Sequence, residues 1–252
     1  MHGNATRCEE DDKLVTLTHK FPPSENPSPC KTCRVRATSF CDVLIGGPAP
    51  SRSLTQHHET AARHDLFEPD KTHESVYVIC DGWAFRFRRT EDGRRYIPNF
   101  LFAGDVVYGF SKNAGFSLQA LTDIRYCKFV RAELKARIRE EPRTYDAWIA
   151  ARIAERTELA VTAAALAQFS AAERIAQLVL RLRDRLDARG MLHNESCAFP
   201  LRQVHIADAT GLTTVHVSRT ISAFRKAGVF TIDDGKLTIL NLAKLRRIVE
   251  RE

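Results

Sequence analysis

The sequence predicts an α+β fold in which an antiparallel β-roll is followed by a long helix and then by a winged helix-turn-helix. Three observations support this prediction. From Val76 onward, β-branched and aromatic residues alternate around short Asp-Gly turns. From about Arg131 the spacing of apolar residues becomes helical. Near the C-terminus, two short helical segments flank Gly211 and precede an Asp-Asp-Gly turn.

Composition excludes several classes of protein. The 252 residues are 44 % hydrophobic and 27 % charged, which argues against a disordered or collagen-like chain. The net charge of +7 is compatible with an anionic partner, and seven cysteines, an odd number, disfavour a fully paired disulfide framework. The first 20 residues lack the apolar run of a signal peptide, and no stretch reaches 18 apolar residues. We therefore expect a cytoplasmic protein without a membrane partner.

The N-terminal segment divides into a polar arm and a cysteine-rich stretch. Residues 1 to about 29 are rich in Pro and Ser and predict a mobile arm. The stretch CKTCRVRATSFC then brings Cys30, Cys33 and Cys41 close together in sequence, and GGPAPSRS forms a low-complexity connection after it.

The β-roll is expected over roughly residues 55–130. Asp81-Gly82 and Asp92-Gly93 lie between apolar runs and predict two hairpins. In the first strand Val76, Val78 and Cys80 should share one face, with Tyr77 and Ile79 on the other.

A long helix is expected from Pro142, in its first turn, to about Leu166. An apolar stripe runs along it, formed by Ile149, Ile153, Ala160, Ala163 and Ala167. This stripe could pack on the helix's own domain or against the same helix of a second chain. We favour the dimer because the stripe is longer than a small β-roll could cover.

The C-terminal part predicts a winged helix-turn-helix. Ser170 and Glu173 form the capping box of a helix that Gly190 ends. Helices are then expected over 202–209 and 214–227, with a hairpin at residues 233–235. The last 51 residues hold nine basic and five acidic side chains. These features favour DNA binding over an ordinary helical hairpin.

The second helix of this motif supplies the expected contacts to DNA. Thr213 can cap its N-terminus, and the following turns would lie in the major groove. Arg can bind guanine through two hydrogen bonds, and Ser can bond to several bases. The expected contact residues are Thr213, Thr214, Val215, His216, Ser218 and Arg219.

The cysteine spacing suggests a metal site that is incomplete in sequence. Thiolates are soft ligands for zinc, copper and iron–sulfur clusters. Cys30, Cys33 and Cys41 give three ligands, whereas a closed site needs four. The fourth could be Cys80, Cys127 or Cys197, and Cys80 could equally be a small buried apolar residue. Spacing alone does not choose among them.

The whole pattern resembles the catabolite-activator/FNR superfamily of bacterial regulators over about residues 55–245. The segments FLFAGDVVYGF and SLQALTDIRYC are similar to the region where FNR-type oxygen sensors carry their internal cluster cysteine, and AERIAQLVLRL and GLTTVHVSRT extend the similarity. The seven-residue gap before Cys41 looks like the alpha-proteobacterial FNR branch. The resemblance implies a 4Fe–4S cluster held by Cys30, Cys33, Cys41 and Cys127.

The resemblance also implies an organisation and a function. The expected units are an arm with the cysteine cluster (1–54), a sensory β-roll of the cyclic-nucleotide-binding jelly-roll type (55–135), a dimerisation helix (136–168) and a winged helix-turn-helix DNA-binding domain (169–252). The protein would be a homodimeric transcriptional regulator, not an enzyme. It would bind palindromic promoter DNA at low oxygen and act with RNA polymerase.

The sequence departs from the family pattern at three places. Val215 stands where most FNR proteins have a Glu, so it cannot accept a hydrogen bond from cytosine N4 but could contact a thymine methyl. Leu159 replaces an acidic residue that hinders dimerisation in the enteric sensor, which adds it to the expected dimer helix residues. SKNAGFSLQAL lacks the Arg of a cyclic-nucleotide phosphate cassette, which argues against cyclic AMP.

Two other functions remain open. One is a regulator of the same family that senses haem-bound gas or a small ligand without a cluster. The candidate haem ligands His57, His58, His64 and His73 lie in a polar stretch, where histidines are usually solvated. The other is a cupin-like metalloenzyme, which the absence of histidine between Val76 and Val130 makes remote.

Overall fold

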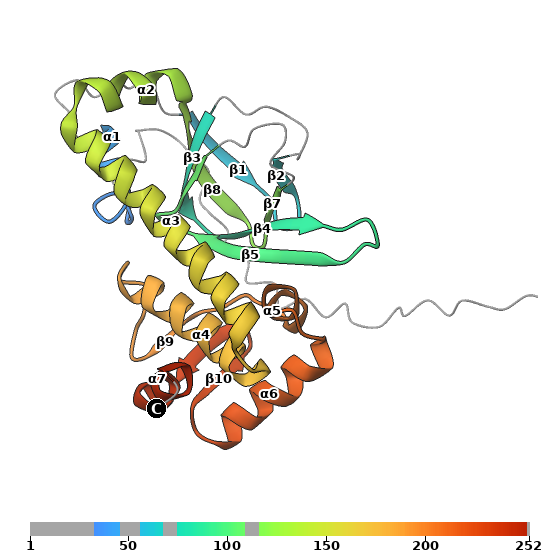
Figure 1. Ribbon diagram of the computed structural model, residues 1–252. Coiled ribbons are helices and arrows are strands. Elements are labelled where there is room, and N and C mark those ends of the chain that lie inside the picture. Colours follow the sequence, from blue (N-terminus) through green and yellow to red (C-terminus); the bar gives the residue numbers. More distant parts are fainter. Residues whose placement is uncertain (1–32, 46–55, 68–74, 109–115, 251–252) are drawn as a thin grey trace, which may run out of the picture.

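The computed structural model describes residues 33–45, 56–67, 75–108 and 116–250, and Figure 1 shows their arrangement. Cys30 and most of the expected arm lie outside these ranges. The described N-terminal part begins with a short helix, α1 (Cys41–Ile45), and continues into eight strands. These are β1 (Gln56–Thr60), β2 (Asp65–Phe67), β3 (Ser75–Asp81), β4 (Trp83–Arg89), β5 (Arg95–Phe102), β6 (Val106–Tyr108), β7 (Ser117–Ala120) and β8 (Ile124–Val130).

The eight strands form two antiparallel sheets, in the orders β1-β8-β3-β6 and β2-β7-β4-β5. The expected hairpin at Asp92-Gly93 joins β4 to β5. The expected hairpin at Asp81-Gly82 is wrong, because β3 and β4 belong to different sheets and the chain crosses between them there. Gly82 permits this crossing: its φ is +84°, and a Cβ would lie 2.2 Å from the carbonyl oxygen of Asp123.

Both faces of the described sheets carry buried apolar residues. Tyr77 and Ile79 of β3 point inward, toward Ala84 and Leu118 of the second sheet. Val76 and Val78 point outward, as the alternation predicted, into a cluster with Cys41 and Cys127. Strands covered on both faces need further elements to pack against them, and helices supply these.

Two helices follow the roll, and Figure 1 shows the second running along the molecule from the roll to the C-terminal domain. They are α2 (Arg131–Glu140) and α3 (Pro142–Gln168). Pro142 begins α3, as expected, where its missing N–H costs no hydrogen bond.

The C-terminal domain has the expected winged helix-turn-helix. It contains α4 (Ala171–Asp187), β9 (Ser196–Ala198), α5 (Gln203–Thr210), α6 (Thr214–Lys226), β10 (Phe230–Asp233), β11 (Lys236–Ile239) and α7 (Leu242–Glu250). The Ser170–Glu173 capping box is present, and Gly211 ends α5 with a φ of +67°. Strands β10 and β11 form the predicted hairpin, and β9 adds a third strand to it.

Candidate DNA interface and cysteine site

Helix α6 presents an exposed N-terminal turn. Thr213 lies at its N-cap, and its hydroxyl accepts a hydrogen bond from the backbone N–H of His216 at 3.2 Å. The buried face of α6 carries Val217, Ile221 and Phe224. The remaining expected contact residues are exposed or partly exposed: Thr214, Val215, His216, Ser218 and Arg219. This arrangement leaves the side chains free to reach base edges in a major groove.

Val215 stands out on that surface because 59 % of an apolar side chain is exposed to solvent. Intramolecular packing therefore does not explain a valine here. A thymine methyl would provide an apolar partner for it.

Helix α5 is fixed by a buried histidine. The Nδ1 atom of His205 accepts a hydrogen bond from the backbone N–H of Arg202 at 3.1 Å. Burial and the nearby charges of Arg202 and Arg95 lower the pKa of His205 to about 3, so the ring is neutral at physiological pH. The ring also packs against Phe85 of the β-roll, with 5.4 Å between centroids. His205 thus links the helix-turn-helix to the roll.

The β-roll and the winged helix-turn-helix domain share one hydrophobic core. Outward-facing residues of β4 and β5, among them Trp83 and Phe102, cluster with the buried face of α4 and with Phe199. The rings of Trp83 and Phe199 are 6.2 Å apart, and Arg95 forms an ion pair with Asp208 of α5 at 2.6 Å. The winged helix-turn-helix domain is therefore packed firmly on the roll in this conformation.

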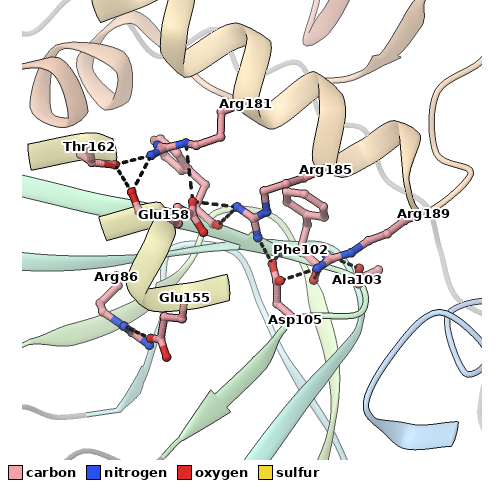
Figure 2. Close-up of polar contacts among 11 residues, drawn as sticks. Arg86, Phe102, Ala103, Asp105, Glu155, Glu158, Thr162, Arg181, Arg185 and Arg189 are labelled. Atoms are coloured by element: carbon pink, nitrogen blue, oxygen red, sulfur yellow. Dashed lines mark hydrogen bonds and ion pairs between the residues drawn. The ribbon is translucent and has the colours of Figure 1, made fainter. Parts of the chain in front are cut away.

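A buried charge network reinforces this packing (Figure 2). Asp105, between β5 and β6, forms ion pairs with Arg185 at 2.7 Å and Arg189 at 2.6 Å. Burial alone would raise the pKa of Asp105, but the charges of the two arginines outweigh it and hold the pKa below its usual range. Asp105 also accepts a hydrogen bond from the backbone N–H of Phe102 at 2.9 Å.

Helix α3 joins the same network from its own side. Glu158 pairs with Arg185 at 3.0 Å, and Arg181 donates to Thr162. One turn earlier, Glu155 pairs with Arg86 of β4 at 2.6 Å. Arg181 and Arg185 of α4, with Arg189 just after it, thus tie the roll and the long helix to the winged helix-turn-helix domain.

The opposite face of α3 carries the stripe expected at a dimer interface. All six residues of the expected set are exposed in the single chain: Ile149, Ile153, Leu159, Ala160, Ala163 and Ala167. Ile153 is 60 % exposed. The described part of the chain does not cover this stripe, so packing on its own domain, the other interpretation of the pattern, does not explain it.

Four of the five cysteines in the described residues gather on the outer face of the first sheet. Cys41 of α1 and Cys127 of β8 are buried in one cluster, and Cys80 packs against it. The Sγ atoms of Cys80 and Cys127 are 3.0 Å apart. The pKa of the Cys33 thiol is raised, mainly by its hydrogen bond with Cys80 and, to a smaller extent, by burial. The fold therefore places three expected ligands in one region, because Cys41 and Cys127 share a buried cluster and Cys33 lies beside Cys80 and Cys41. Cys30 lies outside the described residues.

Cys80 is the thiol whose place the spacing did not reveal. Its position in a strand was equally compatible with a ligand and with a small buried apolar residue. In the structure it contacts two of the expected ligands, Cys127 and Cys33. Cys197 lies elsewhere, on β9 in the core shared by the roll and the C-terminal domain, where burial raises its pKa to about 11. Within the described ranges, no three His, Cys, Asp or Glu side chains are arranged to hold a metal ion.

The cysteine site is in contact with α3 through aromatic rings. Phe40, next to Cys41, lies 6.1 Å from Trp148 of α3 between ring centroids. Trp148 packs edge-on against Tyr108 at 4.2 Å, and Arg152 lies over the Tyr108 ring. A movement of the 33–41 segment would therefore act directly on the long helix through the contact between Phe40 and Trp148.

The structure adds little about the candidate haem ligands and the segment compared with a cyclic-nucleotide phosphate cassette. His58 stacks on Tyr126, and His64 is exposed, whereas His73 and the side chain of His57 lie outside the described residues. The first five residues of SKNAGFSLQAL (111–115), on which the argument against cyclic AMP rests, also lie outside them. Among the described helices, none is long and apolar enough to cross a membrane.

Comparison with known proteins agrees with this architecture. The profile of the Crp-like helix-turn-helix domain matches residues 173–248. The chain is 26 % identical to the nitrogen fixation regulation protein FixK of Bradyrhizobium diazoefficiens, over 87 % of this chain and 93 % of that protein. It is 29 % identical to the transcriptional activatory protein AadR of Rhodopseudomonas palustris, over 84 % and 90 %.

The fold is similar to a solved structure, FixK2 from Bradyrhizobium japonicum. The TM-score is 0.70 at 21 % identity, covering 77 % of this chain and 97 % of FixK2. The relatives named above are regulators rather than enzymes. With its β-roll, long helix and winged helix-turn-helix in the same order, this chain belongs to the Crp/Fnr family of DNA-binding transcriptional regulators.

Proposed function

We propose that this regulator is a homodimer that senses oxygen through a 4Fe–4S cluster and binds palindromic promoter DNA at low oxygen. The observation that carries the proposal is that Cys33 and Cys41 of one segment lie in the same region as Cys127 of strand β8, beside the long helix. Within the described residues these thiols are near one another but are not yet grouped as the ligands of a metal. Cys30, three residues before Cys33, would complete the ligand set.

The donor chemistry of the site fits such a group. Four cysteine thiolates are the usual ligands of a 4Fe–4S cluster. When bound, the cluster would supply an oxygen-sensitive link between the N-terminal cysteines and strand β8. Cys127 lies on a strand that is hydrogen-bonded to β1 and β3, so it would provide the rigid side of that link.

The chain's own residues then transmit the state of the site. Phe40 belongs to the 33–41 segment and contacts Trp148, and Arg152 connects the same region to Glu155. Glu155 and Glu158 lie on the side of α3 that holds the arginine network, while the apolar stripe faces away. A shift of the segment would alter how α3 presents its stripe to a second chain.

In a dimer, the two α6 helices would reach half-sites about one helical turn, roughly 34–36 Å, apart. The exposed turn from Thr213 to Arg219 would read each half-site. Contact with RNA polymerase would then make promoter binding productive, a step that transcription in vitro with purified polymerase measures.

Anaerobic purification tests the cluster directly. We expect a brown protein with about four iron and four sulfide per chain. Cys127→Ser should lose both, while Cys197→Ser should keep them, because Cys197 lies in the core cluster that does not contain the other cysteines. A colourless wild-type protein after anaerobic reconstitution, with DNA affinity indifferent to oxygen, would refute the proposal.

A further inference from the structure

We infer that Cys80 and Cys127 form a peroxide-sensitive thiol pair that closes to a disulfide. The two residues lie on neighbouring antiparallel strands, β3 and β8, in the outward-facing cluster. Their Sγ atoms are 3.0 Å apart. A disulfide needs about 2.05 Å, so a shift of roughly 1 Å closes the bond.

A β-bulge explains why these two thiols meet. Along the β3–β8 ladder Val78 pairs with Cys127 and Ile79 with Tyr126, but Arg125 pairs with Asp81. Cys80 is therefore the extra residue of a bulge. In a regular ladder Cys80 would be only a diagonal neighbour of Cys127, at about 7–8 Å between backbone positions. A bulge re-aims its side chain, and here it brings the sulfur of Cys80 onto that of Cys127.

The two thiols differ in access to solvent, which sets the order of the reaction. Cys127 is 2 % exposed, whereas Cys80 is only partly buried. A small oxidant such as hydrogen peroxide would therefore reach Cys80 first. Its sulfur attacks one peroxide oxygen, the O–O bond breaks, and a sulfenic acid and water result.

The buried partner then completes the reaction. The sulfur of Cys127 attacks the sulfur of the sulfenic acid, the S–S bond forms, the S–O bond breaks, and a second water leaves. Both thiol protons end in the two waters, and the two electrons lost by sulfur reduce the peroxide. A thiol reductant reverses the change.

The disulfide would withdraw Cys127 from the cysteine site. This consequence rests on the proposed function, because it matters only if Cys127 is a cluster ligand. Peroxide would then block cluster assembly in a chain that has lost its cluster, which separates a peroxide signal from the oxygen signal. The formation of the disulfide itself does not depend on the cluster.

Disulfide mapping of the full-length, cluster-free chain tests the inference. The protein is treated with hydrogen peroxide, alkylated, digested with trypsin without reduction and analysed by mass spectrometry. We expect residues 72–86, which contain Cys80, linked to residues 126–128, which contain Cys127. Two thiols per chain should be lost and should return with dithiothreitol.

Variants provide the controls. Cys80→Ala should leave Cys127 open to alkylation after unfolding, whereas Cys197→Ser and Cys33→Ser should form the same linked peptides as wild type. Full alkylation of both Cys80 and Cys127 in peroxide-treated wild type would overturn the inference. So would a link from Cys80 to Cys33, or a link found only between two chains.

Iron and sulfide analysis keeps this test apart from the proposed function. If untreated protein fails to take up a cluster but the mapped disulfide forms, only the cluster proposal is wrong. If the cluster assembles and no Cys80–Cys127 link forms with peroxide in the cluster-free chain, only the thiol pair is wrong.

Discussion

The carboxylate of Asp105 is the centre of the contact between the β-roll and α4, and its replacement gives the sharpest test of that contact. Asp105→Asn keeps the size of the side chain and an oxygen that can still accept the Phe102 N–H. It removes the negative charge that faces Arg185 and Arg189 at 2.7 and 2.6 Å. Two largely buried guanidinium groups then lose a counter-ion.

The loss in the free energy of unfolding depends on the polar partners that Arg185 and Arg189 retain in the variant. Breaking a buried ion pair from one side typically costs about 3–5 kcal/mol. Arg185 retains Glu158 at 3.0 Å, and Arg189 retains the carbonyl of Ala103 at 2.8 Å. We therefore expect the lower end of the range, a loss of about 3 kcal/mol in the free energy of unfolding.

Urea unfolding followed by tryptophan fluorescence measures this loss. Trp83 is a suitable reporter because it packs on Phe102 at 4.8 Å, beside the network. Asp233→Asn is the matched control: Asp233 also pairs with an arginine, Arg225, but both side chains are more than half exposed. Such surface pairs contribute about 0–1 kcal/mol.

The pH dependence gives a second readout. Because the folded pKa of Asp105 is lowered, its contribution is present above the unfolded value, about 3.9, and disappears as pH falls below it. The difference between wild type and Asp105→Asn should therefore stay constant from pH 5 to 8. If Asp105→Asn is no less stable than Asp233→Asn, the network does not hold the domains together.

Three further predictions concern the DNA interface, the dimer and α5. Arg219→Ala should weaken DNA binding by about 1–3 kcal/mol at one base pair, measured by titration of single-base operator variants; an equal loss on every sequence would mean that Arg219 contacts phosphate only. Ile153→Arg should give a folded monomer in analytical ultracentrifugation, because the Ile153 side chain is 60 % exposed in the single chain and belongs to the expected interface. Ala154→Arg, which lies off the stripe, should still dimerise. A dimeric Ile153→Arg protein would exclude this interface. Because the pKa of His205 falls to about 3 on folding, from about 6.5, the unfolded chain binds the extra proton. Wild type should therefore lose about 2 kcal/mol of stability between pH 7 and 5, and urea titrations should show that His205→Gln removes this dependence; an unchanged slope would show that His205 is not its source.

Local chemistry made much of the fold predictable. The capping box at Ser170, Pro142 at the start of α3 and the αL turn at Gly211 depend on neighbouring residues, so the sequence alone located them. The Asp92-Gly93 hairpin followed for the same reason. Asp81-Gly82 carries the same turn signal, yet joins two sheets, because sheet membership depends on pairing with distant strands.

The cysteine site divides in the same way. The sequence placed Cys30, Cys33 and Cys41 together, and family resemblance added Cys127, but no local rule placed Cys80. Its position beside Cys127, 47 residues along the chain, depends on a bulge in the ladder between β3 and β8. The arginine network was also beyond the sequence, since Asp105, Glu158 and Arg185 meet only when three separate elements pack.

The sequence by itself thus determined the order of the elements, the exposed stripe of α3 and the exposed N-terminal turn of α6, because short-range periodicity and capping control them. Only the tertiary structure decided that the roll and the DNA-binding domain share one core and that the cysteine site contacts the long helix through Phe40 and Trp148. Those features are long-range contacts, and burying apolar faces and pairing buried charges decides them after the local elements have formed.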